Sequence, residues 1–167
     1  MARARRQTQR RETGVKGARI LVVEARFYEG IADALLAGAK RVLEAAKVEY
    51  DTVTVPGALE IPQAIALALD AAEARGAPYD GVVALGCVIR GETSHYDIVA
   101  GESARALMNI GVMRGVPVGN GILTVDTDAQ ARVRASHDGG DKGGVAAAAA
   151  LALVRLKRDR PSPRKRR

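Results

Sequence analysis

The sequence predicts an α/β protein, a three-layer αβα sandwich built around a mainly parallel four-stranded sheet. Short continuous apolar runs, typical of strands covered on both faces, alternate with segments whose apolar residues recur at helical spacing. Glycine, proline and small polar residues separate these segments. Such alternation indicates parallel strands joined by crossover helices, so we expect helices on both faces of the sheet.

Length and composition fit one folded domain. The chain has 167 residues, of which 47% are hydrophobic and only 3% aromatic, so alanine and the aliphatic residues must fill the core. Cys87 is the single cysteine, which excludes an internal disulfide and suits a reducing compartment. No apolar run approaches the ~20 residues of a membrane span, and the first residues lack the apolar segment of a secretory signal. We expect a soluble, cytoplasmic protein.

The net charge of +7 comes from the two ends of the sequence. Residues 1–17 contain six basic residues and one acidic residue, residues 155–167 contain eight and one, and the part between them is net acidic. We expect a folded domain over residues 18–156 between disordered basic arms at 1–17 and 157–167. The arms could bind nucleic acid or an acidic partner by counterion release, or simply stay solvated. The arms contain neither aromatic residues between the basic ones nor a known nucleic-acid-binding motif, so the sequence does not favour nucleic acid as their partner.

The first expected strand is the apolar run at residues 20–23. After a turn at 25–28, apolar residues at helical spacing between Ile31 and Leu43 predict a helix. Phe27, the only phenylalanine, lies in the turn. In a parallel sheet the carboxyl ends of the strands face the ligand crevice, so Phe27 could stack on a planar ring. A hydrophobic plug at the start of the helix is the alternative interpretation.

The second strand is expected at residues 53–55. The segment PGALEIP at 56–62 then leads into a helix that ends near the Gly-Ala-Pro break at 76–78. Gly57 permits close approach of a ligand to the backbone. Glu60 lies in the first turn of the helix, where the helix dipole favours a carboxylate. It could serve only that role, or it could accept hydrogen bonds from a ligand.

The segment GCVIRGETSHYD at residues 86–97 carries the strongest functional signal. It follows an apolar run at 82–85 that predicts a buried strand, and it precedes a helix indicated by apolar residues over 98–113. Thr93 and Ser94 are candidates for the N-cap. Glycines before a helix start expose backbone N–H groups, and these N–H groups bind oxyanions or phosphate.

His95, one of two histidines, follows this anion seat directly. Imidazole exchanges protons near neutral pH, so a histidine beside an anion site suggests acid–base chemistry. A lone histidine at a helix start is also common as a surface or capping residue. From these residues alone both interpretations stay open.

The last strand is expected at residues 117–124. A short helix capped by residues 126–128 and containing Arg134 follows, then a flexible glycine-rich link at 139–144 and an alanine-rich helix at 145–154. The complete order of elements is that of a flavodoxin-like sandwich.

Three separated motifs resemble the lumazine synthase (6,7-dimethyl-8-ribityllumazine synthase) family in the same order. They are PGALEIP at 56–62, LGCVIRGETSHYD at 85–97 and GILT at 121–124, and the likeness runs from about Ala18 to about Leu156. The resemblance implies a transferase of riboflavin biosynthesis. Its substrates would be 5-amino-6-(ribitylamino)uracil and 3,4-dihydroxy-2-butanone 4-phosphate, with phosphate released and neither metal nor organic cofactor needed.

A non-catalytic lumazine- or flavin-binding protein and a cargo-packaging scaffold are the alternatives. The first would need His95 or Arg134 replaced, and both are present. The second would depend on the basic arms alone. Neither alternative accounts for all three motifs.

The resemblance also implies roles for single residues. His95 would transfer protons during imine formation and elimination, and Arg134 would clamp the phosphate. The residues implied to bind substrate fall into three groups. Those at the heterocycle are Phe27, Cys87, Val88, Ile89 and Asn120. Those at the ribityl chain are Gly57, Ala58, Leu59 and Glu60. Those at the phosphate are Gly91, Glu92, Thr93 and Lys142.

Two residues depart from the family pattern. Asn120 stands where many members carry an aromatic residue, so the heterocycle is expected to be stacked on one side only. Cys87 replaces a commoner hydroxyl residue, and we interpret it as a packing group rather than a nucleophile because no cation adjoins it in sequence.

The family builds its sites between neighbouring subunits of a pentamer, so we expect a homopentamer here. Phe27 and the segment 86–97 would come from one subunit and Asn120 and Arg134 from the next. Assembly of pentamers into a shell and binding of a riboflavin synthase are left open.

Overall fold

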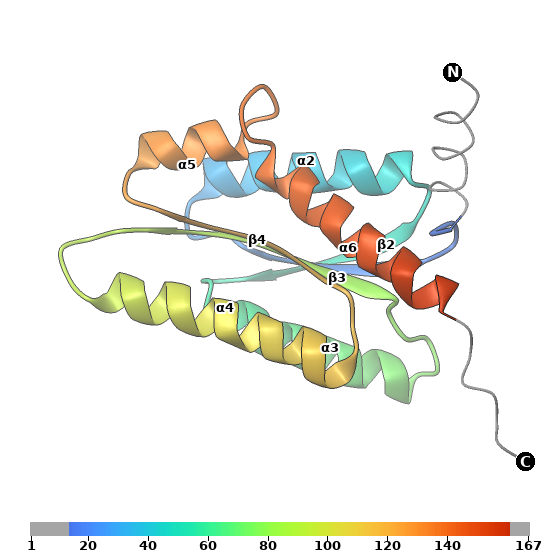
Figure 1. Ribbon diagram of the computed structural model, residues 1–167. Coiled ribbons are helices and arrows are strands. Elements are labelled where there is room, and N and C mark those ends of the chain that lie inside the picture. Colours follow the sequence, from blue (N-terminus) through green and yellow to red (C-terminus); the bar gives the residue numbers. More distant parts are fainter. Residues whose placement is uncertain (1–13, 161–167) are drawn as a thin grey trace, which may run out of the picture.

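The computed structural model describes residues 14–160. The strands are β1 (Arg19–Ala25), β2 (Glu49–Val55), β3 (Gly81–Ile89) and β4 (Val118–Val125), and they form one parallel sheet in the order β2-β1-β3-β4. The helices are α2 (Glu29–Ala45), α3 (Glu60–Ala74), α4 (His95–Arg114), α5 (Asp128–Ala135) and α6 (Lys142–Asp159). Helices α2, α5 and α6 cover one face of the sheet and α3 and α4 the other (Figure 1). The three-layer, flavodoxin-like α/β prediction is confirmed.

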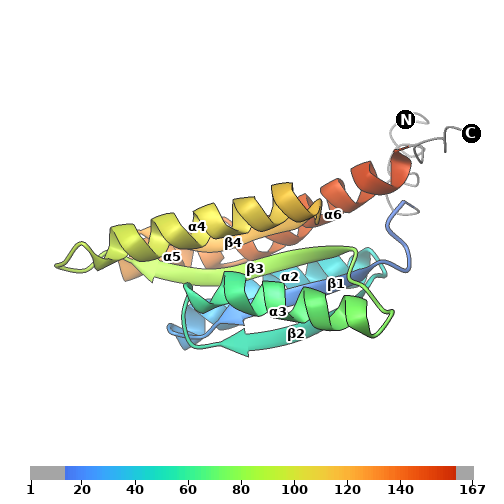
Figure 2. The ribbon, with the colours of Figure 1, turned by 90° about the horizontal axis from the view of Figure 1, so that it is seen from below.

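The two faces of the sheet carry separate cores because side chains alternate along each strand. In β1, Ile20 and Val22 pack with α2 and α6, whereas Leu21 and Val23 pack with α3 and α4. All four side chains are fully buried. On the second face, α3 lies over the β1–β2 side and α4 over the β3–β4 side (Figure 2). The central strands are therefore covered on both sides, which is why their sequences read as continuous apolar runs.

The predicted ends of several helices are also found. Thr127 caps α5, because its Oγ1 accepts a hydrogen bond from the Gln130 N–H at 3.2 Å. Helix α4 ends at Gly115, whose φ of 62° lies in the left-handed region that favours glycine.

Strand β3 is longer than predicted. Residues 86–89 continue the strand, whereas the sequence pattern placed them in a loop. Position 86 is a glycine because α3 packs closely against the strand there. A Cβ on Gly86 would lie 3.1 Å from Ile61 Cδ1. Cys87 and Ile89 therefore face the α2 side of the sheet and Val88 the α3 side.

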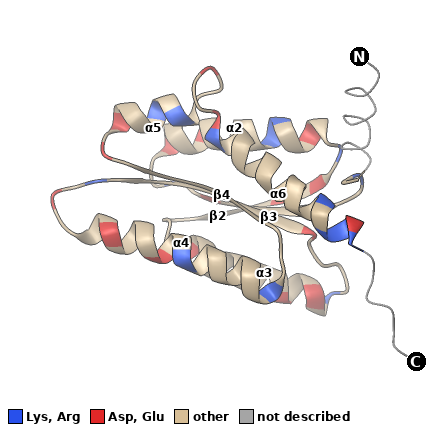
Figure 3. Ribbon diagram, viewed as in Figure 1, with Lys and Arg blue, Asp and Glu red and all other residues tan. Residues whose placement is uncertain are grey.

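Helix α6 begins earlier than predicted. Residues 142–144 are helical, so the expectation of a flexible link is wrong for this part of the chain. Gly143 and Gly144 are buried, and a Cβ on Gly143 would lie 1.9 Å from the carbonyl oxygen of Leu35 in α2. These glycines let two helix backbones approach closely. Charged residues of α6 accordingly lie only at its two ends (Figure 3).

Replacing Gly143 by alanine is expected to lower the free energy of unfolding by about 1–3 kcal/mol, because the added methyl group overpacks the α2–α6 contact. Gly101→Ala in α4 is the matched control, since a Cβ there meets no atom within 4 Å. That control is expected to be neutral or stabilising by about 0.5–1 kcal/mol. Denaturant unfolding at equal protein concentrations measures both. Equal stability of the two variants would contradict this account of Gly143.

The described chain extends slightly beyond the expected domain. Val15 is buried in the core under α2, and α6 continues to Asp159. Most of the two predicted arms, namely residues 1–13 and 161–167, lies outside the described residues. Within residues 14–160, no helix has the length and apolarity needed to cross a membrane.

Candidate active site

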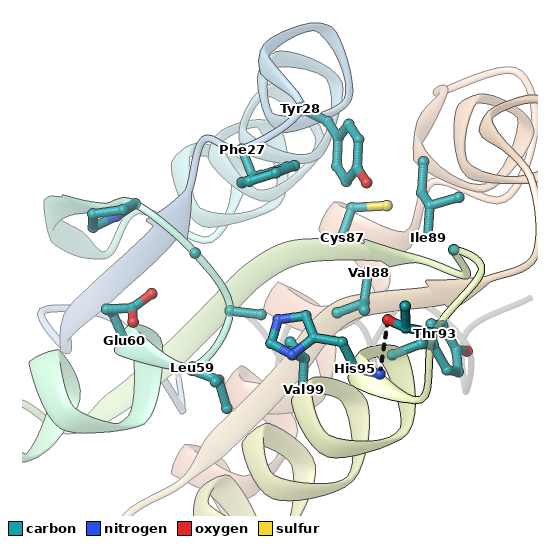
Figure 4. A pocket seen from close by; sticks show the side chains of 15 residues that line it. Phe27, Tyr28, Leu59, Glu60, Cys87, Val88, Ile89, Thr93, His95 and Val99 are labelled. Carbon is teal, nitrogen blue, oxygen red and sulfur yellow. Dashed lines mark hydrogen bonds between the residues drawn. The ribbon is translucent and has the colours of Figure 1, made fainter.

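A cavity of about 530 Å³ opens at the carboxyl ends of β1, β2 and β3 (Figure 4). The chain passes from β1 to β2 on one side and then to β3 on the other, so this is the point at which the strand order reverses. Open parallel sheets bind ligands at such a point. The lining residues are Phe27, Tyr28, Pro56, Gly57, Ala58, Leu59, Glu60, Cys87, Val88, Ile89, Gly91, Thr93, His95, Tyr96 and Val99.

Most of the residues that the resemblance implied for the site line this one cavity. Four do not line it, namely Glu92, Asn120, Arg134 and Lys142. Four lining residues were missed by sequence reasoning. Tyr28, Pro56 and Tyr96 are direct neighbours of residues in the motifs, and Val99 lies one helical turn after His95 on the same face of α4. These four residues could have been predicted from their position beside motif residues or one helical turn away from them.

Phe27 offers a free aromatic ring. Its side chain is 73% exposed, so the alternative of a hydrophobic plug is wrong. The contact to Tyr28 is edge-on, with the ring centroids 5.0 Å apart and the planes at 70°. Because the ring is so exposed, a planar ligand can stack on Phe27.

Glu60 supplies a carboxylate on the opposite wall. It is the first residue of α3, and Gly57 makes room for it: a Cβ on Gly57 would lie 2.9 Å from Glu60 Oε2. No side chain or backbone group within the described residues donates a hydrogen bond to this carboxylate. Its oxygens are therefore available to hydroxyl or N–H groups of a ligand.

The start of α4 brings His95 to the cavity. Ser94 occupies the N-cap position without a side-chain cap bond, so its predicted capping role is wrong. Thr93 takes part instead, because its Oγ1 accepts a hydrogen bond from the His95 backbone N–H at 3.4 Å. A Cβ on Gly91 would meet no atom within 4 Å, which leaves open space beside the backbone there. The His95 imidazole projects into the cavity in Figure 4.

Arg90 fastens this loop to the rest of the domain. Its Nε donates to Asp126 Oδ1 at 3.2 Å, and its NH1 donates to Asp97 Oδ1 at 3.4 Å. The guanidinium lies 4.0 Å from the centre of the Tyr96 ring. The end of β3, the first turn of α4 and the connection from β4 to α5 are thereby joined beside the cavity.

Cys87 and Tyr28 form the inner wall and stay protonated. Burial and, to a smaller extent, the nearby charge of Asp128 together raise the pKa of the Cys87 thiol to about 11. Burial likewise raises the pKa of Tyr28, with smaller contributions from Cys87 and Asp128. A neutral thiol is a poor nucleophile, which agrees with the interpretation of Cys87 as a packing group.

Alkylation of Cys87 by iodoacetamide at pH 8 is expected to be roughly a hundredfold slower than that of a free cysteine. The pKa is raised, so the thiolate fraction should increase about tenfold per pH unit up to pH values near the pKa. Mass spectrometry of the time course measures the rate. Urea-unfolded protein is the control and should react at the rate of a free thiol. Reaction at that rate in the folded protein would contradict the buried, neutral thiol.

The cavity contains no lysine or arginine among its lining residues. Arg134 is exposed on α5, where its NH1 donates to the Gln130 carbonyl at 3.2 Å, and Lys142 is exposed at the start of α6. Asn120 lies in β4 and lines a second cavity, of about 560 Å³, between α4 and α6. Its Oδ1 accepts a hydrogen bond from the Ile122 N–H at 2.9 Å. The cations implied for a phosphate are thus absent from this cavity of the single chain.

The fold and the cavity together define a class: an open parallel α/β protein with a ligand cavity where the strand order reverses, lined by an exposed aromatic ring, a free carboxylate and a histidine. Comparison with known proteins gives the particular family. The chain matches the 6,7-dimethyl-8-ribityllumazine synthase family over residues 17–158, and it belongs to that family.

Relatives over nearly the full length carry the same name. The 6,7-dimethyl-8-ribityllumazine synthase of Nitrobacter winogradskyi is 63% identical over 158 residues, which cover 95% of this chain and 97% of that protein. The protein of Rhodopseudomonas palustris strain BisA53 is 60% identical over the same shares of both chains. In Rhizobium meliloti, 6,7-dimethyl-8-ribityllumazine synthase 1 is 63% identical over 86% of this chain and 94% of that protein.

Proposed function

We propose that this protein condenses 5-amino-6-(ribitylamino)uracil with 3,4-dihydroxy-2-butanone 4-phosphate to 6,7-dimethyl-8-ribityllumazine, with release of phosphate. This is the penultimate step of riboflavin biosynthesis. The observation that carries the proposal is that two of the three family motifs, at 56–62 and 85–97, line one cavity together with Phe27, in a chain that matches the family over residues 17–158.

We assign the heterocyclic substrate to the part of the cavity lined by Phe27 and residues 87–89, which Figure 4 shows. The exposed face of Phe27 stacks on the pyrimidine ring, and the backbone of residues 87–89 contacts its polar edge. Gly57, Ala58 and Leu59 line the path of the ribityl chain, and Glu60 accepts hydrogen bonds from its hydroxyl groups. The unpartnered Glu60 carboxylate and the free ring face support this assignment.

The phosphate binds beside the loop that precedes α4. Backbone N–H groups of Gly91, Glu92 and Thr93 contact it at the positive end of the helix. His95 moves the protons when the amine of the uracil forms an imine with the ketone and when phosphate leaves. The open space at Gly91 and the position of His95 in the same cavity support these roles.

A homopentamer completes the site. Asn120, Arg134 and Lys142 act in the cavity of a neighbouring subunit, where Arg134 supplies the charge that the single chain lacks. Two observations support this. The cavity has no cation in its lining, and α4 exposes large apolar side chains, namely Met108, Val112 and Met113 at 66%, 70% and 81%. Exposed apolar surface of this kind is typical of protein interfaces.

The reaction needs neither a metal nor an organic cofactor. Within residues 14–160 there is no cluster of three metal-ligating side chains. We place the enzyme in the cytoplasm, with a riboflavin synthase as the natural consumer of its product. The basic arms remain candidates for contacts with nucleic acid or cargo, outside the catalytic function.

Formation of the lumazine from the two purified substrates tests the proposal. Absorbance follows the product, and a phosphate assay should show one phosphate released per lumazine. A protein that binds the lumazine but turns over neither substrate would overturn the enzyme assignment and favour the binding scaffold.

A further inference from the structure

Glu24 is a carboxylate buried within the sheet. It lies in the central strand β1, on the same face as Ile20 and Val22, and it is 4% exposed. It is the one charged residue among the buried residues of the described chain. Burying a charge is costly unless the charge is paired and hydrogen-bonded, and an apolar residue would fill such a position at lower cost. The position therefore calls for an explanation beyond core packing.

The partners of Glu24 connect three elements. Thr54 of β2 donates from its Oγ1 to Glu24 Oε1 at 3.0 Å. Arg26 NH1 donates to Glu24 Oε2 at 3.2 Å, and the other terminal nitrogen of Arg26 pairs with Asp33 of α2 at 2.5 Å. The Arg26 backbone N–H also donates to the Val55 carbonyl at 3.3 Å. This bond extends the pairing of β1 with β2 one residue beyond the end of β1. Arg26 is thus fixed by both its backbone and its side chain.

Phe27 follows Arg26 directly, and its ring has little packing of its own. The side chain is 73% exposed, and the ring contact it makes is the edge-on one to Tyr28. An exposed ring keeps one orientation only when the backbone that carries it is held. The contacts of Arg26 provide that restraint on one side of Phe27, and the start of α2 provides it on the other.

We propose that Glu24 is a positioning residue which, through Arg26, holds the turn between β1 and α2 and so fixes the Phe27 ring over the cavity. The position of the Phe27 ring can be tested in the protein alone, without substrate. The consequence for catalysis rests on the proposed function, in which Phe27 stacks on the pyrimidine substrate. Because the Phe27 ring is already ordered in the free protein, less conformational entropy is lost when the substrate binds, and the affinity is higher.

Two substitutions separate positioning from stability. Glu24→Leu removes the acceptor of Arg26 and the acceptor of Thr54 but places an apolar side chain among apolar neighbours. Arg26 is not left unpaired, because its side chain is partly exposed and keeps Asp33 as a partner. Glu24→Gln keeps an oxygen for Arg26 and can donate its N–H to Thr54, so a smaller effect is expected. Glu73→Gln is the matched control, because Glu73 is an exposed carboxylate that pairs with Arg114 at 3.4 Å at the far end of α3.

Fluorine NMR reads out the ring directly, because Phe27 is the only phenylalanine in the chain. Full-length protein labelled with fluorophenylalanine gives a single resonance. We expect that resonance to shift and sharpen in Glu24→Leu, to shift less in Glu24→Gln and to stay unchanged in Glu73→Gln. A resonance in Glu24→Leu that coincides with that of the wild type would overturn the proposal, whatever the activity. If Glu24→Leu yields no soluble protein, Thr54→Val removes one bond to Glu24 and is judged by the same criterion.

Steady-state kinetics test the consequence. In Glu24→Leu we expect the KM for the pyrimidine substrate to rise roughly fivefold to tenfold. The kcat and the KM for the butanone phosphate should change less than about twofold, because only binding of the ring is affected. Equal rises in both KM values would indicate general loosening and overturn the proposal. A shifted resonance with an unchanged KM would uphold the positioning and instead contradict the role of Phe27 in the proposed function.

Discussion

Replacing His95 by alanine is expected to lower kcat about 10²- to 10⁴-fold, the usual contribution of a positioned acid–base group. The imidazole projects from the first residue of α4 into the cavity, and in the proposed function the amine and the ketone of the substrates react there. Without the imidazole, water has to donate and accept the protons during imine formation and phosphate elimination. The KM values should change little, because His95 contributes to the transition state more than to ground-state binding. Initial rates of lumazine formation at saturating substrates measure the effect.

His137→Ala is the matched control, since His137 is the second histidine and lies exposed between α5 and α6, with its Nδ1 3.8 Å from Asp141. This variant should keep the wild-type rate. Wild-type kcat in His95→Ala would exclude His95 as the acid–base group of the reaction.

Replacing Arg134 by alanine is expected to raise the KM for the butanone phosphate about 10- to 100-fold, because a hydrogen bond between charged groups contributes about 1.5–3 kcal/mol. An excess of that substrate should therefore restore part of the turnover, while the KM for the pyrimidine stays near the wild-type value. Arg132→Ala is the control, because Arg132 lies two residues earlier in α5 and already pairs with Asp128 at 2.5 Å. An unchanged KM in Arg134→Ala would exclude this residue as the phosphate clamp.

Mixed oligomers of the two impaired variants, assayed at a butanone phosphate concentration well below the KM of Arg134→Ala, test whether sites are shared between subunits. If His95 of one subunit works with Arg134 of the next, random reassembly of His95→Ala and Arg134→Ala subunits in equal amounts restores about a quarter of the sites. No recovery after confirmed subunit exchange would place both residues in the site of one chain. The proposed shared site would then be wrong.

The sequence pattern identified the strands and the cavity well for physical reasons. β1 and β3 are covered on both faces, so residues 20–23 and 82–85 form continuous apolar runs that are easily recognised. The motif residues follow the strands directly, and parallel strands bring their carboxyl ends to one edge of the sheet. Phe27, Glu60 and His95, far apart in sequence, could therefore be expected in one site.

Glycine caused the main errors. Gly86 was interpreted as part of a loop and Gly143 and Gly144 as a flexible link, but all three permit close packing within regular elements. A sequence shows only that a side chain is missing. The reason lies in a neighbouring helix for Gly86 and Gly143, and in the side chain of Asp141 at the start of the same helix for Gly144. The apolar pattern of α4 was similarly ambiguous, because Ile98 and Met113 fit the helix period and yet are exposed in the single chain.

The close contact between α2 and α6 has a consequence during synthesis of the protein. α2 is among the first elements to leave the ribosome, but Ala147, Ala150 and Val154 of α6, which fill the core beside it, emerge more than a hundred residues later. The face under α3 and α4 can assemble while the chain is still growing, whereas the face under α2 stays open to water until α6 arrives. Folding of this half therefore has to wait until α6 has been synthesised, and until then the growing chain carries an exposed apolar surface that chaperones can recognise.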